Sequence, residues 1–292
     1  MFCKIGRRAG TSLSSTPAST TVLSTHALGL IGAGNMAEAL VRGVINSGAI
    51  PLNRIIASDI STERRAYFSE KLGVRATTEN TEVVQNADLL VLCVKPQQVN
   101  DVLKSVASLF DPKKHLLASI CAGVTTARLE APLPAGARTV RVMPNTPMLV
   151  GLGASCLSAG KNASAADVAV IEALFSSASL TLRVEERMMD AVTGLSGSGP
   201  AYLFYLVEAM IDAGIAEGFT REQASQLASR TVLGAAKMLE ETKLPPEELR
   251  RRVTSPNGTT QAAIERLDAD QVKAKITAAV RRAAERSREL GK

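Results

Sequence analysis

The stretch Gly32-Ala33-Gly34-Asn35-Met36-Ala37 fits the pattern G-x-G-x-x-(G/A) and decides the fold. It follows an apolar, strand-like run at 28–31 and opens a helical pattern over 35–47. This context distinguishes a dinucleotide-binding motif from a chance match. The first glycine permits a tight turn, the second lets the backbone approach a pyrophosphate, and the final alanine allows close packing of helix on strand. We therefore predict a dinucleotide site at the start of this helix.

Outward from this motif, short strand-like runs alternate with helical patterns. We expect strands at 28–31, 54–58, 73–76, 88–94, 116–120, 139–142 and 154–157, and helices at 35–47, 62–72, 97–109 and 165–177. Apolar strands separated by helices predict a doubly wound parallel sheet with right-handed crossovers. The fold class is thus α/β, with a Rossmann-type domain over 27–186.

Beyond residue 186 the strand-like runs disappear and helical periodicity takes over. Helices are expected at 201–217, 221–241, 246–253, 259–267 and 271–290. This pattern predicts a second, all-helical domain over 187–292.

The composition narrows the functional classes. The chain has 292 residues and a net charge of +6, but no basic patch with interleaved aromatic residues, which argues against nucleic-acid binding. It holds only two histidines and four cysteines without a CxxC pair, so neither a Ser-His-Asp site nor a metal site is expected. No apolar run reaches the ~18 residues that span a bilayer.

Residues 1–26 are rich in Ser and Thr, and they carry Lys4, Arg7 and Arg8 without any acidic residue. This composition is typical of an organellar transit peptide, here a mitochondrial one, although a disordered extension of a cytoplasmic protein has the same features. We expect a disordered leader.

Residues at other predicted strand ends are candidates for cofactor contacts, because ligands of open α/β sheets bind beyond the carboxyl ends of strands. Ser58-Asp59 ends the second strand, and an acidic residue there favours NADH. Arg64 and Arg65 lie close enough in sequence to receive the 2′-phosphate of NADPH, so the choice stays open with a lean to NADH. Lys95, between Val94 and Pro96, is expected beside the cofactor.

A second candidate site lies in the helical half. The loop Val253–Thr260 carries four hydroxyl groups and leads into a predicted helix. Backbone N–H groups of Gly258 to Thr260 would then be free to hold a carboxylate. An ordinary helix cap with turn residues would have the same sequence.

Several separated motifs together resemble pyrroline-5-carboxylate reductases over residues 28–290. They are Val94-Lys95-Pro96, Met143-Pro144-Asn145-Thr146-Pro147, Ala191-Val192-Thr193-Gly194-Leu195-Ser196-Gly197-Ser198-Gly199-Pro200 and Thr254-Ser255-Pro256-Asn257-Gly258-Thr259-Thr260. Many members have Gly-Gly where this chain has Asn257-Gly258, but Asn tolerates left-handed backbone angles.

This resemblance implies an enzyme that reduces a cyclic imine to proline with NADPH or NADH. It implies an intertwined homodimer, often assembled into a decamer, with an active site between the cofactor and helical segments. The implied cofactor residues, added to the glycine motif, are Asn35, Met36, Ser58, Asp59, Asn80, Val94, Lys95, Pro96, Ala122 and Gly123. The implied substrate residues are Glu186, Ser255, Gly258, Thr259 and Thr260.

The expected mechanism is hydride transfer to the imine carbon while the Thr260 hydroxyl bonds the ring nitrogen. Such an imine arrives protonated, which agrees with the scarcity of histidine. Two rivals share the architecture. A β-hydroxyacid dehydrogenase would need a catalytic lysine in the second half, where Lys237 is the obvious candidate. A redox sensor would bind the cofactor without turning over an imine.

Overall fold

The computed structural model describes residues 22–291, which form two compact units. The first comprises residues up to Gly197 together with 287–291, and the second is Ser198–Arg286. The sequence patterns placed a domain boundary after residue 186, and the division between the units falls later, after Gly197. The chain's last residues return to the first unit.

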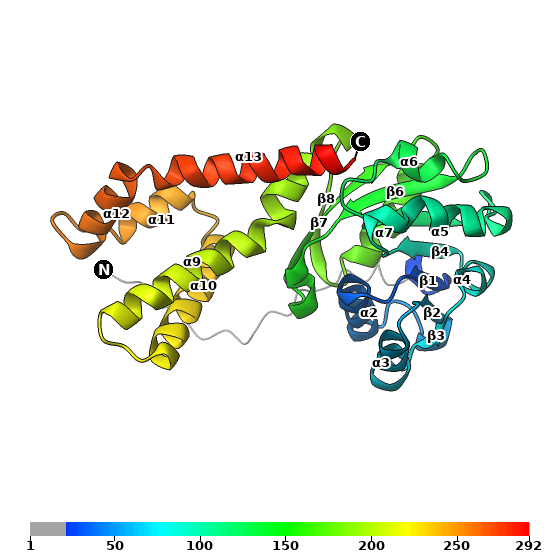
Figure 1. Cartoon of the computed structure of the whole chain (residues 1–292), viewed down its shortest axis with the longest axis horizontal. Helices are drawn as coiled ribbons and strands as arrows, with labels where there is room; N and C mark the ends of the chain where they lie inside the picture. The colour runs from blue at the N-terminus through cyan, green and yellow to red at the C-terminus, as the bar shows by residue number, and fades with distance from the viewer. Residues whose placement is uncertain (1–21, 292) are drawn as a thin grey trace. The chain divides into compact units, whose positions relative to one another are not determined.

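The first unit is built on one eight-stranded sheet with the order β3-β2-β1-β4-β5-β6-β7-β8 (Figure 1). Strand β1 pairs in parallel with both β2 and β4, so the winding direction of the sheet changes at β1. The strands are β1 (Leu28–Ile31), β2 (Ile55–Ser58), β3 (Arg75–Thr77), β4 (Leu89–Leu92), β5 (Leu116–Ser119), β6 (Arg138–Met143), β7 (Gly153–Ala159) and β8 (Ser179–Arg183).

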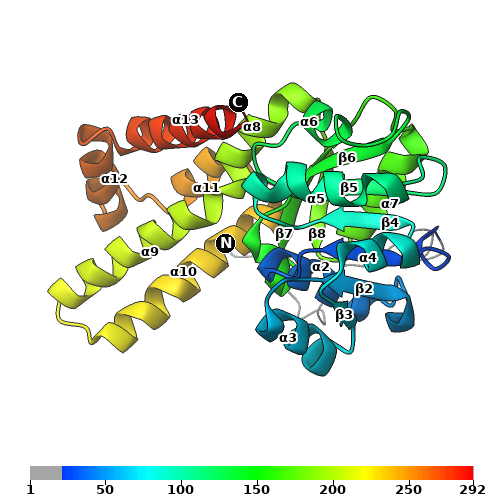
Figure 2. The same ribbon diagram turned by 45° about the vertical axis from the view of Figure 1, so that its right-hand side comes forward.

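The helices of this unit cover both faces of the sheet, as a doubly wound fold requires (Figure 2). One core lies between the sheet and α2 (Asn35–Ser47), α3 (Thr62–Leu72) and α7 (Ala165–Phe175). The other core includes buried residues of α4 (Asn80–Asn86), α5 (Val99–Val106) and α6 (Thr126–Glu130). Successive residues of one strand, such as Leu89 and Leu90, enter opposite cores because their side chains point to opposite faces of the sheet.

Three features of the first unit differ from what the sequence predicted. Strand β7 runs antiparallel to β6, although β8 is again parallel to β7. Strand β8 was not expected: it is the last strand of the sheet, and both of its leucines are exposed, so it lacks the signal of a buried strand. Helices α4 and α6 were also not expected, because they are short and bury only one or two side chains each.

Shorter turns connect these elements. They are the 3₁₀ segments Leu52–Arg54, Pro96–Gln98, Ala107–Leu109, Thr146–Val150 and Glu186–Met188, the single α-turn α8 (Met189–Val192) and a π-helical turn at Thr193–Gly197.

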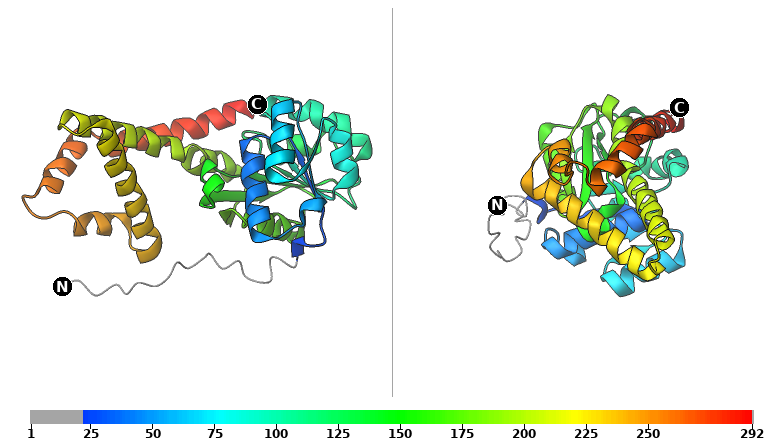
Figure 3. Two further views of the ribbon diagram at one scale, coloured as in Figure 1. Left: turned by 90° about the horizontal axis from the view of Figure 1, so that it is seen from below. Right: turned by 90° about the vertical axis from the view of Figure 1, so that its left-hand side faces the viewer.

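The second unit is entirely helical, as predicted. Its helices are α9 (Gly199–Ala216), α10 (Arg221–Thr242), α11 (Pro246–Arg252), α12 (Thr259–Ala269) and α13 (Val272–Leu290), whose last residues belong to the first unit. Helices α9 and α10 lie side by side as a hairpin (Figure 3). A Cβ added to Gly214 would lie 3.0 Å from that of Ala224, so small residues set this close approach. None of the described helices is long and apolar enough to cross a membrane.

The described part of the expected leader, residues 22–26, is ordered rather than disordered. Leu23 is buried in the first core. The Nδ1 of His26 lies 2.5 Å from the Oδ2 of Asp88, and Arg54 donates to the carbonyl oxygens of Ser24 and Thr25. Sequence composition could not reveal these contacts because their partners lie about 30 to 60 residues away. Residues 1–21 of the leader lie outside the described part.

Candidate functional site

The glycine motif forms a cradle at the carboxyl end of β1. Gly32 has a φ of +100°, which side chains rarely tolerate, and an added Cβ would lie 2.8 Å from the carbonyl oxygen of Cys93. Cys93 donates its own N–H to Ile31 at 2.8 Å, so β1 and β4 continue together up to this turn. The turn therefore requires glycine at position 32, as predicted.

Gly34 supplies the open side of the cradle. It is the N-cap residue of α2 and provides no side-chain cap, and among residues 22–291 nothing beyond its own chain neighbours comes within 4 Å of the position that a Cβ would occupy. The amides at the start of a helix lack intrahelical acceptors, and the helix dipole favours an anion there. The residues present therefore fit the pyrophosphate of a dinucleotide, held by amides of Gly34, Asn35 and Met36.

The end of β2 is tied to this cradle through Asp59. Its Oδ2 accepts from the amide of Ala33 at 2.8 Å, and its Oδ1 accepts from the amide of Ser61 at 2.8 Å. Buried Ser58 donates its hydroxyl to the Oδ1 of Asn80 at 2.7 Å, which links β2 to the first residue of α4. The structure thus brings Ala33, Ser58, Asp59 and Asn80 together, as the resemblance implied.

The ends of β4 and β5 complete the same edge of the sheet. Val94 packs beside Gly32, and exposed Lys95 and half-buried Pro96 follow it. Half-buried Ala122 lies in the loop after β5, where Gly123 has a φ of +74°. Gly123 is covered by the chain's end: a Cβ added to Gly291 would lie 2.7 Å from its carbonyl oxygen. Gly123 therefore shapes this loop against the end of α13.

Glu186 points into the first unit. Its Oε1 accepts from Nη1 of Arg141 at 2.9 Å and from the amide of Thr126 at 3.3 Å. Its Oε2 and the Nη2 of Arg141 are both buried without a hydrogen-bond partner. As a substrate contact, a role that the resemblance implied, Glu186 would have to turn away from Arg141.

Arg141 was missed by the sequence analysis. It lies in the middle of β6, its side chain is only 3% exposed, and its Nη2 is 3.7 Å from Oδ1 of Asp190. The same Asp190 oxygen accepts from the Ser287 hydroxyl at 2.6 Å. A charged residue between Val140 and Val142 in a predicted strand was the available signal, because such a residue needs buried partners.

The loop before α12 has the predicted helix start in the second unit. Asn257 adopts the left-handed conformation with a φ of 58°, and Gly258 is the N-cap without a side-chain bond. One expectation was wrong: the Gly258 amide is not free, because it donates to the Ser255 carbonyl oxygen at 3.0 Å and closes the turn. The amides of Thr259 and Thr260, in the first turn of α12, remain for an anion.

Like its amides, the hydroxyl groups of this loop differ in whether another part of the chain already engages them. Thr254 donates its hydroxyl to the carbonyl oxygen of Arg250 at 2.7 Å. Within residues 22–291, no hydrogen bond engages the hydroxyls of Ser255, Thr259 or Thr260. The loop can therefore offer three hydroxyls and two amides to a small anionic molecule, whereas Thr254 serves the end of α11.

The remaining titratable groups of residues 22–291 do not gather into a further site. Burial raises the pKa of the Cys121 thiol to about 11 and that of Cys93 above its ordinary value, so both are neutral thiols at physiological pH. His115, just before β5, is buried, and burial lowers its pKa. Among the described residues, no His, Cys, Asp and Glu side chains group as metal ligands. Lys237 is exposed and pairs with Glu240 at 2.7 Å.

Two family models match separate parts of the chain. Residues 27–123 match the family model "NADP oxidoreductase coenzyme F420-dependent", and residues 186–290 match "Pyrroline-5-carboxylate reductase dimerisation". The pyrroline-5-carboxylate reductase of Methanosarcina acetivorans is 44% identical over 91% of this chain and 98% of its own length. The chain belongs to the pyrroline-5-carboxylate reductase family.

Other relatives show the same match over nearly the whole length. The Arabidopsis thaliana reductase is 44% identical over 90% of this chain and 95% of its own. The reductase structure from Coxiella burnetii superimposes with a TM-score of 0.85 at 38% identity, covering 92% of this chain and 99% of that one. That from Plasmodium falciparum, with NADP bound, gives 0.83 at 30% identity, covering 92% and 100%.

Proposed function

We propose that this chain reduces 1-pyrroline-5-carboxylate to proline, with NAD(P)H as the hydride donor. Family membership over nine-tenths of the chain, at 44% identity, is the observation that carries this proposal. The two candidate sites suit the two molecules. The cradle at Gly34 suits a dinucleotide pyrophosphate, and the loop before α12 suits a small carboxylate.

The first unit would hold the cofactor through its backbone. Amides of Gly34, Asn35 and Met36 would hold the pyrophosphate at the N-terminus of α2, where the helix dipole favours negative charge. Asp59 would face the adenosine ribose, and Val94, Lys95 and Pro96 would line the adjacent strand end. When bound, the reduced cofactor supplies the hydride.

The loop before α12 would hold the substrate. Amides of Thr259 and Thr260 and the hydroxyl of Ser255 would hold the carboxylate, and the Thr260 hydroxyl would bond the ring nitrogen. The imine is basic enough to bind as its protonated form, so its carbon accepts a hydride without a proton from a protein acid. Catalysis then depends mainly on positioning.

Replacing Thr260 with alanine tests the second site. Thr260→Ala should lower kcat/KM for the imine by about tenfold to a hundredfold, which is the cost of one hydrogen bond of about 1.5–3 kcal/mol to a charged group. The dissociation constant of the cofactor should stay within about twofold in fluorescence titrations. Thr254→Ala is the matched control, since its hydroxyl serves the carbonyl oxygen of Arg250. An unchanged kcat/KM in Thr260→Ala would exclude the role of this hydroxyl.

The two rival functions are distinguished by one assay. Oxidation of NADH or NADPH that depends on added 1-pyrroline-5-carboxylate supports the reductase. Turnover of a β-hydroxyacid instead would support the dehydrogenase, although its candidate lysine, Lys237, is engaged in a surface ion pair. Cofactor binding without any turnover would support a sensor.

The chain forms a homo-oligomer, since its second half matches a dimerisation domain. We further propose that the dimer is intertwined through the second unit and that dimers assemble into a decamer. Light scattering coupled to gel filtration would give the mass, and a mass of two chains at all concentrations would contradict the decamer.

The N-terminal 26 residues are proposed to direct the protein to mitochondria, because they are basic and rich in Ser and Thr. A fluorescent protein fused to residues 1–26 should then colocalise with a mitochondrial marker in a eukaryotic cell. Diffuse cytoplasmic fluorescence would contradict this assignment.

A further inference from the structure

We propose that the adenosine end of the cofactor site prefers NADH, and that Glu38 enforces this preference by keeping Arg64 away from a 2′-phosphate. This inference rests on the proposed function for its kinetic test, although its binding test does not. It makes Glu38, which lies on α2 within the first turn after the cradle, a specificity-determining residue.

The first step is the fixed position of the Asp59 carboxylate. Both of its oxygens accept backbone amides, from Ala33 and from Ser61, each at 2.8 Å. The carboxylate therefore cannot swing away from the cradle without breaking the turn that follows β2. A carboxylate at this position can accept a hydrogen bond from a ribose 2′-hydroxyl, whereas it repels a 2′-phosphate.

The second step concerns Arg64, one of the two arginines of this segment that could offset this repulsion. Its Nε donates to the carbonyl oxygen of Ala33 at 2.7 Å, and its Nη2 donates to Oε2 of Glu38 at 3.0 Å. The guanidinium also lies 4.9 Å from the ring centroid of Tyr67 and 5.6 Å from that of Phe68. Hydrogen bonds and ring contacts thus hold Arg64 against α2 and α3.

The third step is that Glu38 is built to keep its charge. Its side chain is 13% exposed, and its Oε1 also accepts from the Tyr67 hydroxyl at 2.7 Å and from Nε of Arg42 at 3.0 Å. Burial acts to raise the pKa of Glu38, but the bonds from Tyr67, Arg64 and Arg42 outweigh it, so the pKa lies below its ordinary value. The carboxylate is ionised at neutral pH, and it pairs with Arg64 and Arg42 together.

The fourth step excludes the other arginine of this segment. The Nη1 of Arg65 donates to the carbonyl oxygens of Asp59 at 2.8 Å and Ile60 at 2.9 Å, and its Nη2 donates to the Thr62 hydroxyl at 3.0 Å. Arg65 therefore closes the turn between β2 and α3. The N–H groups that make these bonds are engaged by the turn and the cradle, and neither arginine can offer them to a 2′-phosphate while the bonds last.

The binding test uses the full-length protein and two half-cofactors, 5′-AMP and 2′,5′-ADP, in calorimetric titrations. In a site built for a 2′-phosphate, 2′,5′-ADP binds much more tightly than 5′-AMP. We expect the wild-type protein to bind 2′,5′-ADP no more tightly than 5′-AMP, and to bind NADH at least tenfold more tightly than NADPH. Tighter binding of 2′,5′-ADP and of NADPH would overturn the inference, whether or not the protein turns over the imine.

The kinetic test compares kcat/KM for NADH and NADPH with 1-pyrroline-5-carboxylate as substrate. We expect NADH to lead by at least tenfold in the wild type. Asp59→Asn should lower the ratio of kcat/KM for NADH to that for NADPH at least tenfold, mainly by lowering the KM for NADPH. Glu38→Gln removes the charge that pairs with Arg64 but leaves Asp59 intact. It should lower the ratio of kcat/KM for NADH to that for NADPH severalfold, while kcat/KM for NADH itself stays within twofold of wild type.

Glu70→Gln is the matched control, because it removes the same charge from the exposed end of α3. Its cofactor ratio should equal that of the wild type. A ratio that moves equally in Glu70→Gln and Glu38→Gln would show a general charge effect and overturn the role of Glu38. An unchanged ratio in Glu38→Gln would overturn that role as well. Absence of any turnover would instead contradict the proposed reductase function and leave the titrations to decide the preference.

Discussion

At the scale of single residues, Arg141 is a buried charge that joins separate segments of the first unit. It is almost fully buried, and it faces two carboxylates, Glu186 at 2.9 Å and Asp190 at 3.7 Å. Asp190 in turn accepts from Ser287, so this one guanidinium links β6 to the chain's last turn of helix. Removing one partner of such a group leaves the other charges poorly solvated.

Arg141→Met should therefore destabilise the protein. We expect a loss of at least about 2 kcal/mol in urea unfolding, below the roughly 3–5 kcal/mol of a fully buried pair because Glu186 is about one-third exposed. Arg141→Lys should recover only part of this loss, since an ammonium cannot reproduce the planar fork of a guanidinium. A stability within about 0.5 kcal/mol of wild type in Arg141→Met would contradict this reading.

At the scale of elements, the segment before β1 is held to the start of β4 by Asp88. Its Oδ1 accepts from the Ala27 amide at 2.6 Å and its Oδ2 lies 2.5 Å from His26. Burial acts to raise the pKa of Asp88, but the bonds from His26 and Ala27 outweigh it, so the pKa lies below 3.8 in the folded protein. The ionised carboxylate thus stabilises the anchored segment.

This anchor predicts a pH dependence of stability. A lowered folded-state pKa gives a stabilisation that is present above the unfolded value near 3.8 and is lost as the pH falls through the folded value. Asp88→Asn should therefore lower Tm at pH 7, while the two Tm curves should approach each other as the pH falls below the unfolded value near 3.8. A constant difference in Tm across pH 3–7, measured by calorimetry, would show that the charge of Asp88 does not matter.

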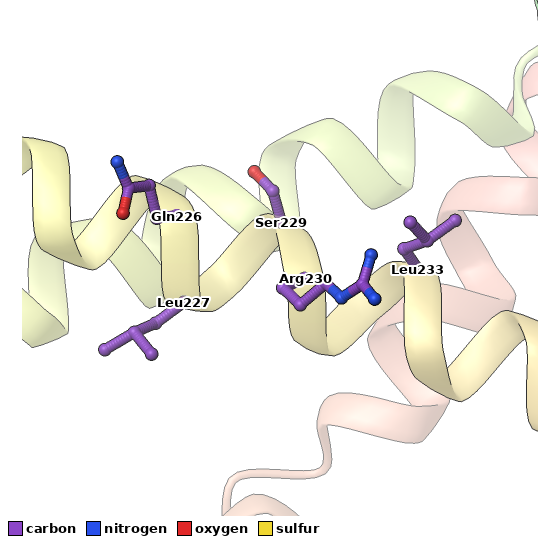
Figure 4. Close-up of a pocket in the computed structure, with 5 residues that line it drawn as sticks. All are labelled: Gln226, Leu227, Ser229, Arg230 and Leu233. Atoms are coloured by element: carbon purple, nitrogen blue, oxygen red, sulfur yellow. The ribbon is translucent and has the colours of Figure 1, made fainter.

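At the scale of the whole molecule, the second unit exposes much apolar surface in a single chain. Helix α9 buries none of its residues, and Leu203, Phe204 and Leu206 are each at least half exposed. Leu227 and Leu233 line an open hollow along α10 with Gln226, Ser229 and Arg230 (Figure 4). Surfaces of this kind commonly mark protein interfaces, in accord with the dimerisation match of residues 186–290.

Charge introduced on this surface should weaken self-association. The double variant Leu227→Glu with Leu233→Glu should shift the mass measured by light scattering toward that of one chain at micromolar concentration, because two carboxylates would have to be desolvated at the interface. Ser105→Glu adds a charge at an exposed position of α5 in the first unit and should leave the mass unchanged. An unaltered mass in the double variant would place the interface elsewhere.

Much of the architecture follows from local patterns in the sequence. The predicted bounds of β1, α2 and α3 agree with the structure because the glycine motif, the helix caps and the apolar periodicity all act over a few residues. The helical second half is recognisable for the same reason. The cradle itself, with its positive φ at Gly32 and its open helix start at Gly34, is also local.

Other features depend on contacts between segments far apart in the chain. The antiparallel placement of β7, the partners of Arg141 and the anchoring of His26 by Asp88 each join residues that no periodicity connects. One local contact was also missed: the Gly258 amide, expected to be free, donates to the carbonyl oxygen of Ser255, three residues earlier. The sequence alone determined which residues could bind a dinucleotide and a carboxylate; only the tertiary structure decided which of their donors, acceptors and charges are already engaged, since that depends on three-dimensional neighbours.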